Sequence, residues 1–313
     1  MKIFRDLSEI RGIKNPVVTT GSFDGVHLGH KVIINRLNAL AKQNNGESVL
    51  ITFYPHPRKV LYPETAGKDL LMINTQREKM ELLKETGLDN LVIINFTLEF
   101  SQTSSIDFIR KILVGILHVK TVVVGFNHHF GHNREGDYDY LYQLGQYYHF
   151  DVEEIPEQDI QNESVSSTKI RKALLEGNIQ RANAYLDHYY NIIGELKESM
   201  TVCREIGFPT YRIASDEEYK LIPPEGVYAV TVRLKNDQFK GLLNIKKCVP
   251  ENENDFRYCF MEILFMDELL SLHNKTVEVC FHKKIRNNIF FEDKELLKKQ
   301  LISDKDLINE LIY

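Results

Sequence analysis

The sequence predicts an α/β chain in two parts, a parallel sheet with helices on both faces followed by a small antiparallel β-barrel. Over roughly the first 180 residues, apolar runs of strand length alternate with helical patterns, as in βαβ units. From about residue 191, short apolar segments separated by turn residues replace the helical pattern, which is typical of small barrels. A last amphipathic stretch, residues 294–312, predicts a terminal helix.

The first part contains four predicted parallel strands. They are expected over residues 16–19, 48–53, 90–94 and 121–125, where β-branched residues and leucine dominate. Helices are expected after residue 30, over 75–86, and over 106–117, with serines at 104 and 105 placed to cap the last of these. Ligands of such sheets bind outside the carboxyl ends of the strands, so the polar residues after each strand are site candidates.

The second part is predicted to be all β until its terminal helix. Strand candidates lie within residues 194–196, 227–232, 241–245, 258–264 and 276–281. The two periodicities meet near Tyr190, so we predict domains over residues 1–188 and 189–313. In the terminal helix, Leu297, Leu301 and Leu307 are expected to face the barrel.

Composition narrows the class of function. A formal net charge of −5 argues against a general nucleic-acid binder, and no apolar run approaches the length of a membrane span. The N-terminus lacks the apolar core of a signal peptide, and none of the four cysteines forms a C-x-x-C pair. We therefore expect a cytoplasmic protein with reduced thiols that acts on small molecules, without nucleic-acid or membrane partners; its oligomeric state is not predicted.

The most informative stretch is the glycine-rich turn GSFDGVHLGH, residues 21–30, between the first strand and the first helix. Glycines let backbone N–H groups approach a ligand closely, and a helix start favours phosphate. His27 and His30 are three residues apart, so they project to the same side of the first helical turn. Such a pair could also bind a metal, but the residues that follow are apolar or lysine rather than further ligands. The turn therefore favours nucleotide phosphates.

Two further segments predict phosphate binding. The loop after the fourth strand, residues 125–137, contains three glycines, three histidines and an arginine. Residues 166–171, SSTKIR, open a helix that a serine or threonine can cap. Lys169 and Arg171 lie in its first turn, where cations oppose the helix dipole unless an anion binds there. A polar surface loop and a solvated charged face remain the alternative interpretations.

These motifs, in this order, resemble those of the bacterial bifunctional riboflavin kinase/FMN adenylyltransferases, also called FAD synthetases. The resemblance rests on residues 21–30, on TFYPHP at 52–57, on VGFN at 124–127 and on SSTKIR at 166–171. It implies a Rossmann-like nucleotidylyltransferase domain of the HxGH type that transfers AMP from ATP to FMN and releases pyrophosphate. ATP, Mg²⁺ and the flavins FMN, FAD and riboflavin are the implied cofactors, substrates and products. One departure is His128, where a second aromatic residue is usual.

The resemblance also implies roles for single residues. His27 and His30 would contact the ATP phosphates, Asn127 would orient ATP or the FMN phosphate, and Arg171 would hold the leaving pyrophosphate. No protein nucleophile is needed, because the FMN phosphate itself attacks and the enzyme contributes positioning and charge stabilisation. The other implied ATP- or flavin-binding residues in this half are Gly21, Phe23, Asp24, Gly25, Gly29, His56, Pro57, Gly125, Ser166, Ser167 and Thr168.

The second half resembles the riboflavin kinase barrel. Glu262 matches the base for the ribityl hydroxyl, and Thr210 matches a ligand of the nucleotide-bound metal. The other implied nucleotide- or flavin-binding residues are Gly207, Pro209 and Asn244. Departures from the family pattern are concentrated near the expected nucleotide site: Tyr211 and Arg212 replace Ala-Asn, Ser199, Cys203 and Lys246 replace glycines, and Asn287 replaces a glutamate.

Several interpretations of function stay open at this point. The barrel is either a divergent working kinase that converts riboflavin and ATP to FMN and ADP, or a non-catalytic flavin-binding or regulatory module behind an adenylyltransferase. The first half could also transfer a nucleotide to a substrate other than FMN, and the barrel is what favours a flavin. A flavin sensor on an enzyme scaffold is disfavoured for the first half by its intact histidines.

Overall fold

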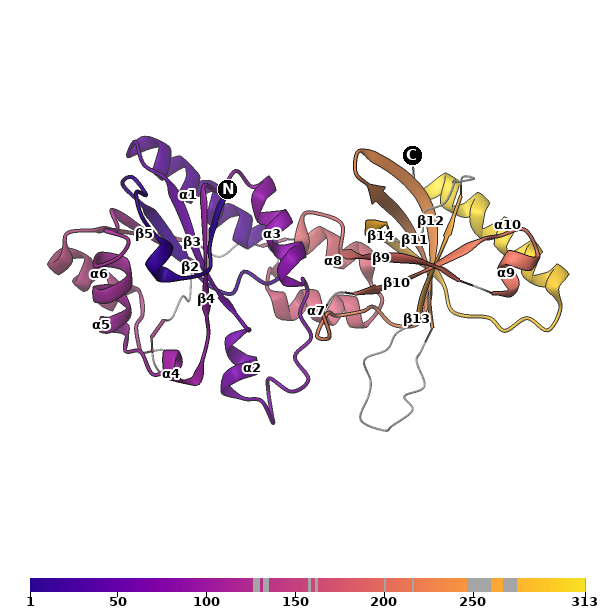
Figure 1. Ribbon diagram of the computed structural model, residues 1–313, viewed down its shortest axis with the longest axis horizontal. Helices are drawn as coiled ribbons and strands as arrows, with labels where there is room; N and C mark the ends of the chain where they lie inside the picture. The colour runs from indigo at the N-terminus through magenta and orange to yellow at the C-terminus, as the bar shows by residue number, and fades with distance from the viewer. Residues whose placement is uncertain are drawn as a thin grey trace. The chain divides into compact units, whose positions relative to one another are not determined.

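The computed structural model describes residues 1–125, 130–131, 135–156, 159–160, 163–199, 201–215, 217–246, 260–266 and 275–312. The chain divides into two compact units (Figure 1). The first comprises Met1–Leu70 and Lys79–Val165, and the second comprises Leu71–Glu78 and Ser166–Tyr313.

The first unit is built on a six-stranded sheet in the order β1-β4-β3-β2-β5-β6, with every neighbouring pair parallel. The predicted parallel sheet is therefore confirmed, and two edge strands are added to the four expected. The strands are β1 (Lys2–Phe4), β2 (Val17–Thr20), β3 (Ser48–Tyr54), β4 (Asn90–Asn95), β5 (Thr121–Gly125) and β6 (Asp151–Ile155). Outside this sheet, β7 (Asp159–Ile160) pairs with β8 (Glu163–Ser164).

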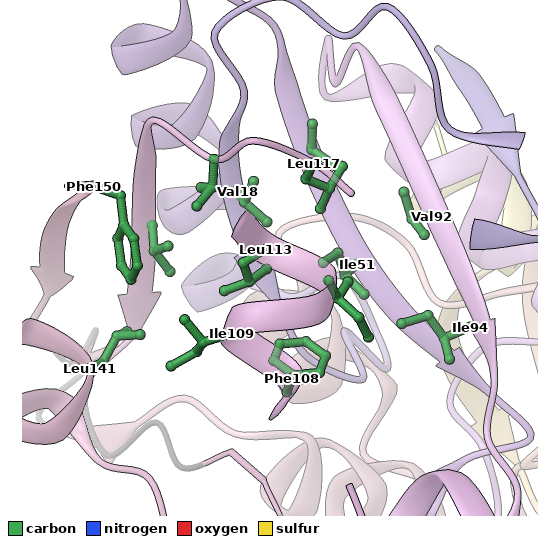
Figure 2. Packing of buried hydrophobic residues seen from close by; sticks show 14 of the residues in the cluster. Val18, Ile51, Val92, Ile94, Phe108, Ile109, Leu113, Leu117, Leu141 and Phe150 are labelled. Atoms are coloured by element: carbon green, nitrogen blue, oxygen red, sulfur yellow. The ribbon is translucent and has the colours of Figure 1, made fainter. Parts of the chain in front are cut away.

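Helices cover both faces of this sheet. The helices along this part of the chain are η1 (Leu7–Glu9), α1 (Leu28–Gln43), α2 (Pro57–Leu61), α3 (Gln76–Glu85), α4 (Leu98–Ser101), α5 (Ser105–Asp107), the π-helix η2 (Phe108–Val114) and α6 (Tyr138–Tyr148). Successive strand residues point to opposite faces, so Val17 packs with Leu37 of α1 while Val18 packs with Ile109 of η2. Figure 2 shows the second of these clusters, with Ile109 and Leu113 directed toward the strands. Because both faces are buried, the strands read as continuous apolar runs.

The second unit contains a closed antiparallel barrel in the order β10-β13-β12-β11-β14-β9, as the sequence predicted. Its strands are β9 (Asn191–Ser199), β10 (Thr210–Ser215), β11 (Gly226–Leu234), β12 (Asp237–Lys246), β13 (Phe260–Phe265) and β14 (Thr276–Arg286). Its helices are α7 (Ser167–Leu175), α8 (Ile179–Leu186), α9 (Val202–Glu205) and α10 (Lys294–Leu311).

The terminal helix α10 packs on one side of the barrel wall through Leu301 and Ile308, which lie in one cluster with Leu264 of β13. The expectation for Leu307 was wrong, since that side chain is 39% exposed. Residues seven apart share a helix face, whereas residue 307 lies more than 100° around the helix from residue 301. A bidentate contact between Arg286 and buried Asp304 also joins the end of β14 to α10.

A buried ion pair joins the first turn of α3 to the loop between β10 and β11 within the second unit. Lys220 Nζ lies 2.6 Å from Glu78 Oε2, and neither side chain is exposed. The same ammonium donates to the carbonyl oxygens of Ile73 and Asn191, both at 2.7 Å. Glu78 Oε1 accepts the backbone N–H of Ile193 at the start of the barrel, so the pair fastens two distant stretches of chain to each other.

None of the described helices is long and apolar enough to span a bilayer. Of the cysteines that the structure describes, Cys203 and Cys280 are free thiols. Burial raises the pKa of Cys280 to about 12. Cys248 and Cys259 lie outside the described residues.

Candidate functional site

The histidine turn follows β2, which lies between β3 and β5 in the sheet. The chain runs from β2 to β3 on one side and returns to β5 on the other, so this end of β2 is a topological switch point, where ligands of such sheets bind. The turn is held in an unusual backbone conformation: φ is +47° at Phe23, +92° at Gly25 and +40° at Val26. Positive φ at a β-branched residue such as Val26 is rare, and such strain is concentrated at functional sites.

Burial of the turn's apolar side chains holds this backbone in place. Phe23 and Val26 belong to the core cluster that includes Leu37 of α1. Asp24 between them is fully buried as well. The turn is therefore anchored by the core, while Gly21 and Gly29 remain partly exposed.

His27 is the N-cap residue of α1, and its Nδ1 accepts the backbone N–H of His30 at 3.4 Å. An imidazole nitrogen that accepts a hydrogen bond carries no proton, so in neutral His27 the proton is on Nε2. The two imidazole rings stack, with centroids 3.6 Å apart and an interplanar angle of 15°. The sequence-predicted pair is thus brought together, with His27 supplying an N–H donor at a helix start.

The pKa of His30 lies well below its ordinary value, because burial disfavours the imidazolium and because His27 and Lys79 repel a further positive charge. His30 is therefore neutral near pH 7. Its Nδ1 is buried without a hydrogen-bond partner among the described residues. A buried polar atom of this kind is unusual in a folded protein and is consistent with a ligand that completes it.

Gly29 lies between the two histidines on the first turn of α1. A Cβ at this position would lie 3.4 Å from the His27 ring, which is ordinary van der Waals contact. The protein itself therefore tolerates a side chain at this position, and the advantage of glycine is the bare backbone that it presents outward.

Sequence reasoning missed a buried lysine beside this turn. Lys79, on α3, is 4% exposed and its ammonium donates to the carbonyl oxygen of Ser22 at 3.0 Å. It brings a fixed positive charge close to His30. Nothing local in the sequence distinguishes Lys79 from other lysines of an amphipathic helix, because only the tertiary fold carries it to the turn.

The remaining predicted residues of the first unit lie on elements other than the histidine turn. His56 is the N-cap of α2, where its Nδ1 accepts the N–H of Arg58, and Pro57 is the first residue of that helix. Gly125 ends β5, and a Cβ there would lie 2.9 Å from the Cδ1 of Ile33 on α1. Asn127 and His128 lie outside the described residues.

In the second unit, the predicted serine-rich segment forms the start of α7. Ser166 is its N-cap and accepts the N–H of Lys169. Ser167 is partly buried, and the Thr168 side chain is exposed. Arg171 Nε donates to the carbonyl oxygen of Leu71 at 2.7 Å, which fixes the direction of the guanidinium.

Of the predicted kinase residues, Thr210, Glu262 and Asn244 lie on the neighbouring barrel strands β10, β13 and β12, while Gly207 and Pro209 lie between α9 and β10. Glu262 on β13 is 4% exposed. Its Oε1 accepts the hydroxyl of Ser199 at 2.6 Å, and its Oε2 pairs with Lys246 Nζ at 3.0 Å. Ser199 and Lys246 are two of the residues that replace family glycines, so two of this chain's departures meet on the predicted base.

Neighbouring strands add a cation and an orphaned acceptor to this wall. Arg212 and Asn244 are the cross-strand partners of Glu262 on either side. The Arg212 guanidinium carbon lies 4.1 Å from the centroid of the Phe260 ring. Asn244 Oδ1 is buried without a partner among the described residues.

These residues do not fit a Mg²⁺ ion held chiefly by protein side chains. Thr210 supplies a single hydroxyl, which lies 2.8 Å from that of Thr201, and Arg212 has no acceptor atom at all. Within the described residues there is no cluster of three His, Cys, Asp or Glu side chains that could hold a metal. Mg²⁺ would therefore enter with ATP, on the phosphate oxygens.

Comparison with known proteins follows the same two-part division. A family profile for FAD synthetase matches residues 10–169, and one for riboflavin kinase matches residues 186–312. The bifunctional riboflavin kinase/FMN adenylyltransferase of Buchnera aphidicola subsp. Schizaphis graminum is 33% identical over 99% of this chain and 98% of its own length. The proteins of that name from Listeria monocytogenes and Escherichia coli are 32% and 31% identical, over 93% and 95% of this chain and 90% and 95% of their own.

A solved structure described as a macrolide-efflux protein from Streptococcus pneumoniae has a TM-score of 0.87 and 25% identity, covering 98% of both chains. Its likeness therefore extends over both parts of the fold. With two profiles matched in order and relatives aligned nearly end to end, this chain belongs to the family of bifunctional riboflavin kinase/FMN adenylyltransferases.

Proposed function

We propose that this chain makes FAD in two steps, with riboflavin and ATP giving FMN and ADP in the C-terminal half, and FMN and ATP giving FAD and pyrophosphate in the N-terminal half. The functional halves are residues 1–188 and 189–313, and the protein is cytoplasmic. The observation that carries the first activity is the stacked pair of His27 and His30 at the start of α1, beside the end of β2.

In the adenylylation step, an oxygen of the FMN phosphate bonds to the α-phosphorus of ATP while the bond to pyrophosphate breaks. His27 Nε2 donates to a phosphate oxygen, and the start of α1 supplies backbone N–H groups. Because His30 is held neutral, it binds phosphate as a hydrogen-bonding group rather than as a full charge. Preorganised donors of this kind stabilise charge that develops in the transition state.

The other predicted residues of this half act on the nucleotide or on the leaving group. Asn127 orients a phosphate, and Ser167, Thr168 and Arg171 hold pyrophosphate. The backbone carbonyl contact of Arg171 supports this role, since it limits the rotamers open to the guanidinium and so lowers the entropy lost on binding an anion.

In the kinase step, Glu262 takes the proton of the ribityl hydroxyl as that oxygen bonds to the γ-phosphorus and ADP leaves. A general base must be an ionised carboxylate within reach of the hydroxyl. Contacts at 3.0 Å with Lys246 Nζ and at 2.6 Å with the Ser199 hydroxyl hold the Glu262 carboxylate in one position, which supports a working kinase over a purely structural barrel.

The test is to incubate the purified protein with ATP and Mg²⁺ together with either riboflavin or FMN, and to separate the flavins by chromatography. We expect FAD from FMN, and FMN followed by FAD from riboflavin. FAD from FMN alone would leave an adenylyltransferase with a non-catalytic barrel, and no FAD from FMN would refute the main proposal.

A matched pair of variants locates the first reaction. His30→Ala should slow FAD formation from FMN more than tenfold, because it removes a donor from the phosphate site. His118→Ala, which changes a histidine that lies outside the turn, is the control and should leave the rate unchanged. Equal rates for the two variants would contradict the role given to His30.

A further inference from the structure

The proposed kinase base, Glu262, forms an ion pair with a lysine at a position where the family pattern has glycine. Lys246, at the end of β12, pairs with Glu262 through an ammonium–carboxylate distance of 3.0 Å. The lysine side chain is 49% exposed, whereas that of Glu262 is 5% exposed. The ion pair thus joins a buried carboxylate to a half-exposed lysine side chain.

Both oxygens of this carboxylate are engaged. Ser199 holds Oε1 from β9, and Lys246 holds Oε2 from β12. An ionised carboxylate has about four lone-pair sites, so these two contacts do not saturate it, but a substrate hydroxyl must reach one of the remaining sites past the partner that lies nearer to solvent. Ser199 lies within the barrel wall and is 6% exposed, so Lys246 is the partner whose side chain can move away from the carboxylate.

The surroundings of Lys246 suit a polyanion. Its ammonium lies 5.5 Å from the centroid of the Phe260 ring, and the guanidinium of Arg212 stacks on the same ring. Two cations therefore lie next to one carboxylate, which leaves an excess of positive charge at this wall. The orphaned Asn244 Oδ1, on the strand next to Glu262, is an independent sign that a ligand completes this surface.

We propose that Lys246 is a positioning residue that couples nucleotide binding to release of the kinase base. Without nucleotide, its ammonium is held by Glu262; when ATP binds, the ammonium moves to the phosphates and the carboxylate is freed for the ribityl hydroxyl. This inference rests on the proposed kinase function, and it implies that the nucleotide binds before the hydroxyl can be deprotonated.

Competition for one ammonium makes a distinctive prediction about nucleotide affinity. Glu262→Gln keeps an acceptor for Ser199 but releases Lys246, so ADP should bind at least fivefold more tightly. Lys246→Met should weaken ADP about tenfold, since a charge-assisted contact to phosphate is lost. The double variant should match Lys246→Met, because no lysine remains to be released.

ADP affinity is measured by calorimetry on the full-length protein at fixed Mg²⁺. The N-terminal half also binds nucleotide, and its isotherm is an internal reference because no substitution touches it. Lys240→Met is the control: Lys240 lies on the same strand, and its ammonium makes no ion pair within the described part of the chain. FAD formation from FMN and the melting temperature report that each variant is folded, and Lys246→Gln is a second variant in case Lys246→Met is not.

Kinetics give a second readout that a merely structural lysine would not produce. Lys246→Met should raise the KM for ATP at least fivefold without lowering kcat, because the base is then free at all times. Three results would overturn the proposal: Glu262→Gln leaving ADP affinity unchanged or weaker, Lys246→Met leaving it unchanged or tighter, or a wild-type barrel that binds no ADP. Failure of the kinase function itself would appear differently, as ADP binding that obeys these predictions without any FMN formed from riboflavin.

Discussion

Replacing Lys220 by Met should destabilise the second unit by about 3 kcal/mol. The substitution keeps the length and apolar stem of the side chain but removes its charge. All three donors of the ammonium are used, toward Glu78 Oε2 at 2.6 Å and toward the carbonyl oxygens of Ile73 and Asn191 at 2.7 Å. Neither charged side chain has any exposed surface, so no water can replace the lost contacts.

The size of the destabilisation follows from the Glu78 charge that stays buried after the substitution. Breaking a buried pair by removing one partner costs about 3–5 kcal/mol, because the other charge stays buried and uncompensated. Glu78 keeps the backbone N–H groups of Thr75 and Ile193, at 2.8 and 2.9 Å, which places the loss near the lower end. For a unit of this size, a loss of about 3 kcal/mol lowers the melting temperature by about 6–12 °C.

The assay is urea denaturation of the full-length protein, with hydrogen exchange at the Ile193 amide as a local readout. Lys172→Met is the control, since that lysine is 77% exposed and lies 3.9 Å from its partner Glu176; it should cost less than about 0.5 kcal/mol. Adding Glu78→Gln to Lys220→Met should recover part of the loss by removing the stranded charge. A loss below about 1 kcal/mol for Lys220→Met, or no recovery in the double variant, would refute the reasoning.

Four further outcomes are expected. Gly29→Ala should leave the melting temperature unchanged, since its Cβ meets the His27 ring at an ordinary 3.4 Å, while FAD formation falls more than tenfold if a ligand lies against the bare backbone. Arg212→Asn should raise FMN formation from riboflavin at limiting Mg²⁺, because it adds an oxygen ligand where none exists. Because the pKa of His30 is lowered in the folded protein, the unfolded chain binds a proton at acidic pH that the folded chain does not. As the pH decreases from about 6.5, the free energy of unfolding of the first unit should therefore decrease by up to about 1.4 kcal/mol per pH unit. His30→Ala should flatten this slope. Cys280, whose pKa burial raises to about 12, should resist iodoacetamide in the folded protein at pH 8 and react once urea unfolds it.

The central strands could be predicted from the sequence because burial on both faces gives them unbroken apolar runs. Strand β5 was predicted with its bounds, and the first helix with its start at the histidine turn. The edge strand β6, DVEEI, escaped notice because its acidic residues lie on both faces of the strand, so no alternation of apolar and polar residues is left to detect. The short edge strand β1 has three residues and no periodicity to detect.

The two sites differ in how much of them a sequence can predict. His27, Gly29 and His30 lie within one helical turn, so their proximity follows from spacing alone. The wall around Glu262 is assembled from four strands, β9, β10, β12 and β13, and only the barrel register brings Ser199 and Lys246 to the same carboxylate. The sequence therefore shows that Ser199 and Lys246 replace family glycines. Their shared contact with Glu262 depends on long-range strand pairing, which the sequence alone does not reveal.

The two proposed sites also differ in charge, since the first offers neutral histidines and the second a carboxylate beside cations. The chemistry of the two reactions accounts for this difference. In adenylylation the nucleophile is already an anion, so no base is needed, and in the proposed site a neutral donor such as His30 would suffice beside the phosphates. Phosphorylation of a hydroxyl needs a carboxylate close to the triphosphate, and like charges a few ångströms apart repel by several kcal/mol in a protein environment. A cation between the two relieves that repulsion. The ammonium of Lys246, 3.0 Å from Glu262 Oε2, is such a cation in the proposed kinase site, and its loss is expected to weaken nucleotide binding rather than to slow proton transfer.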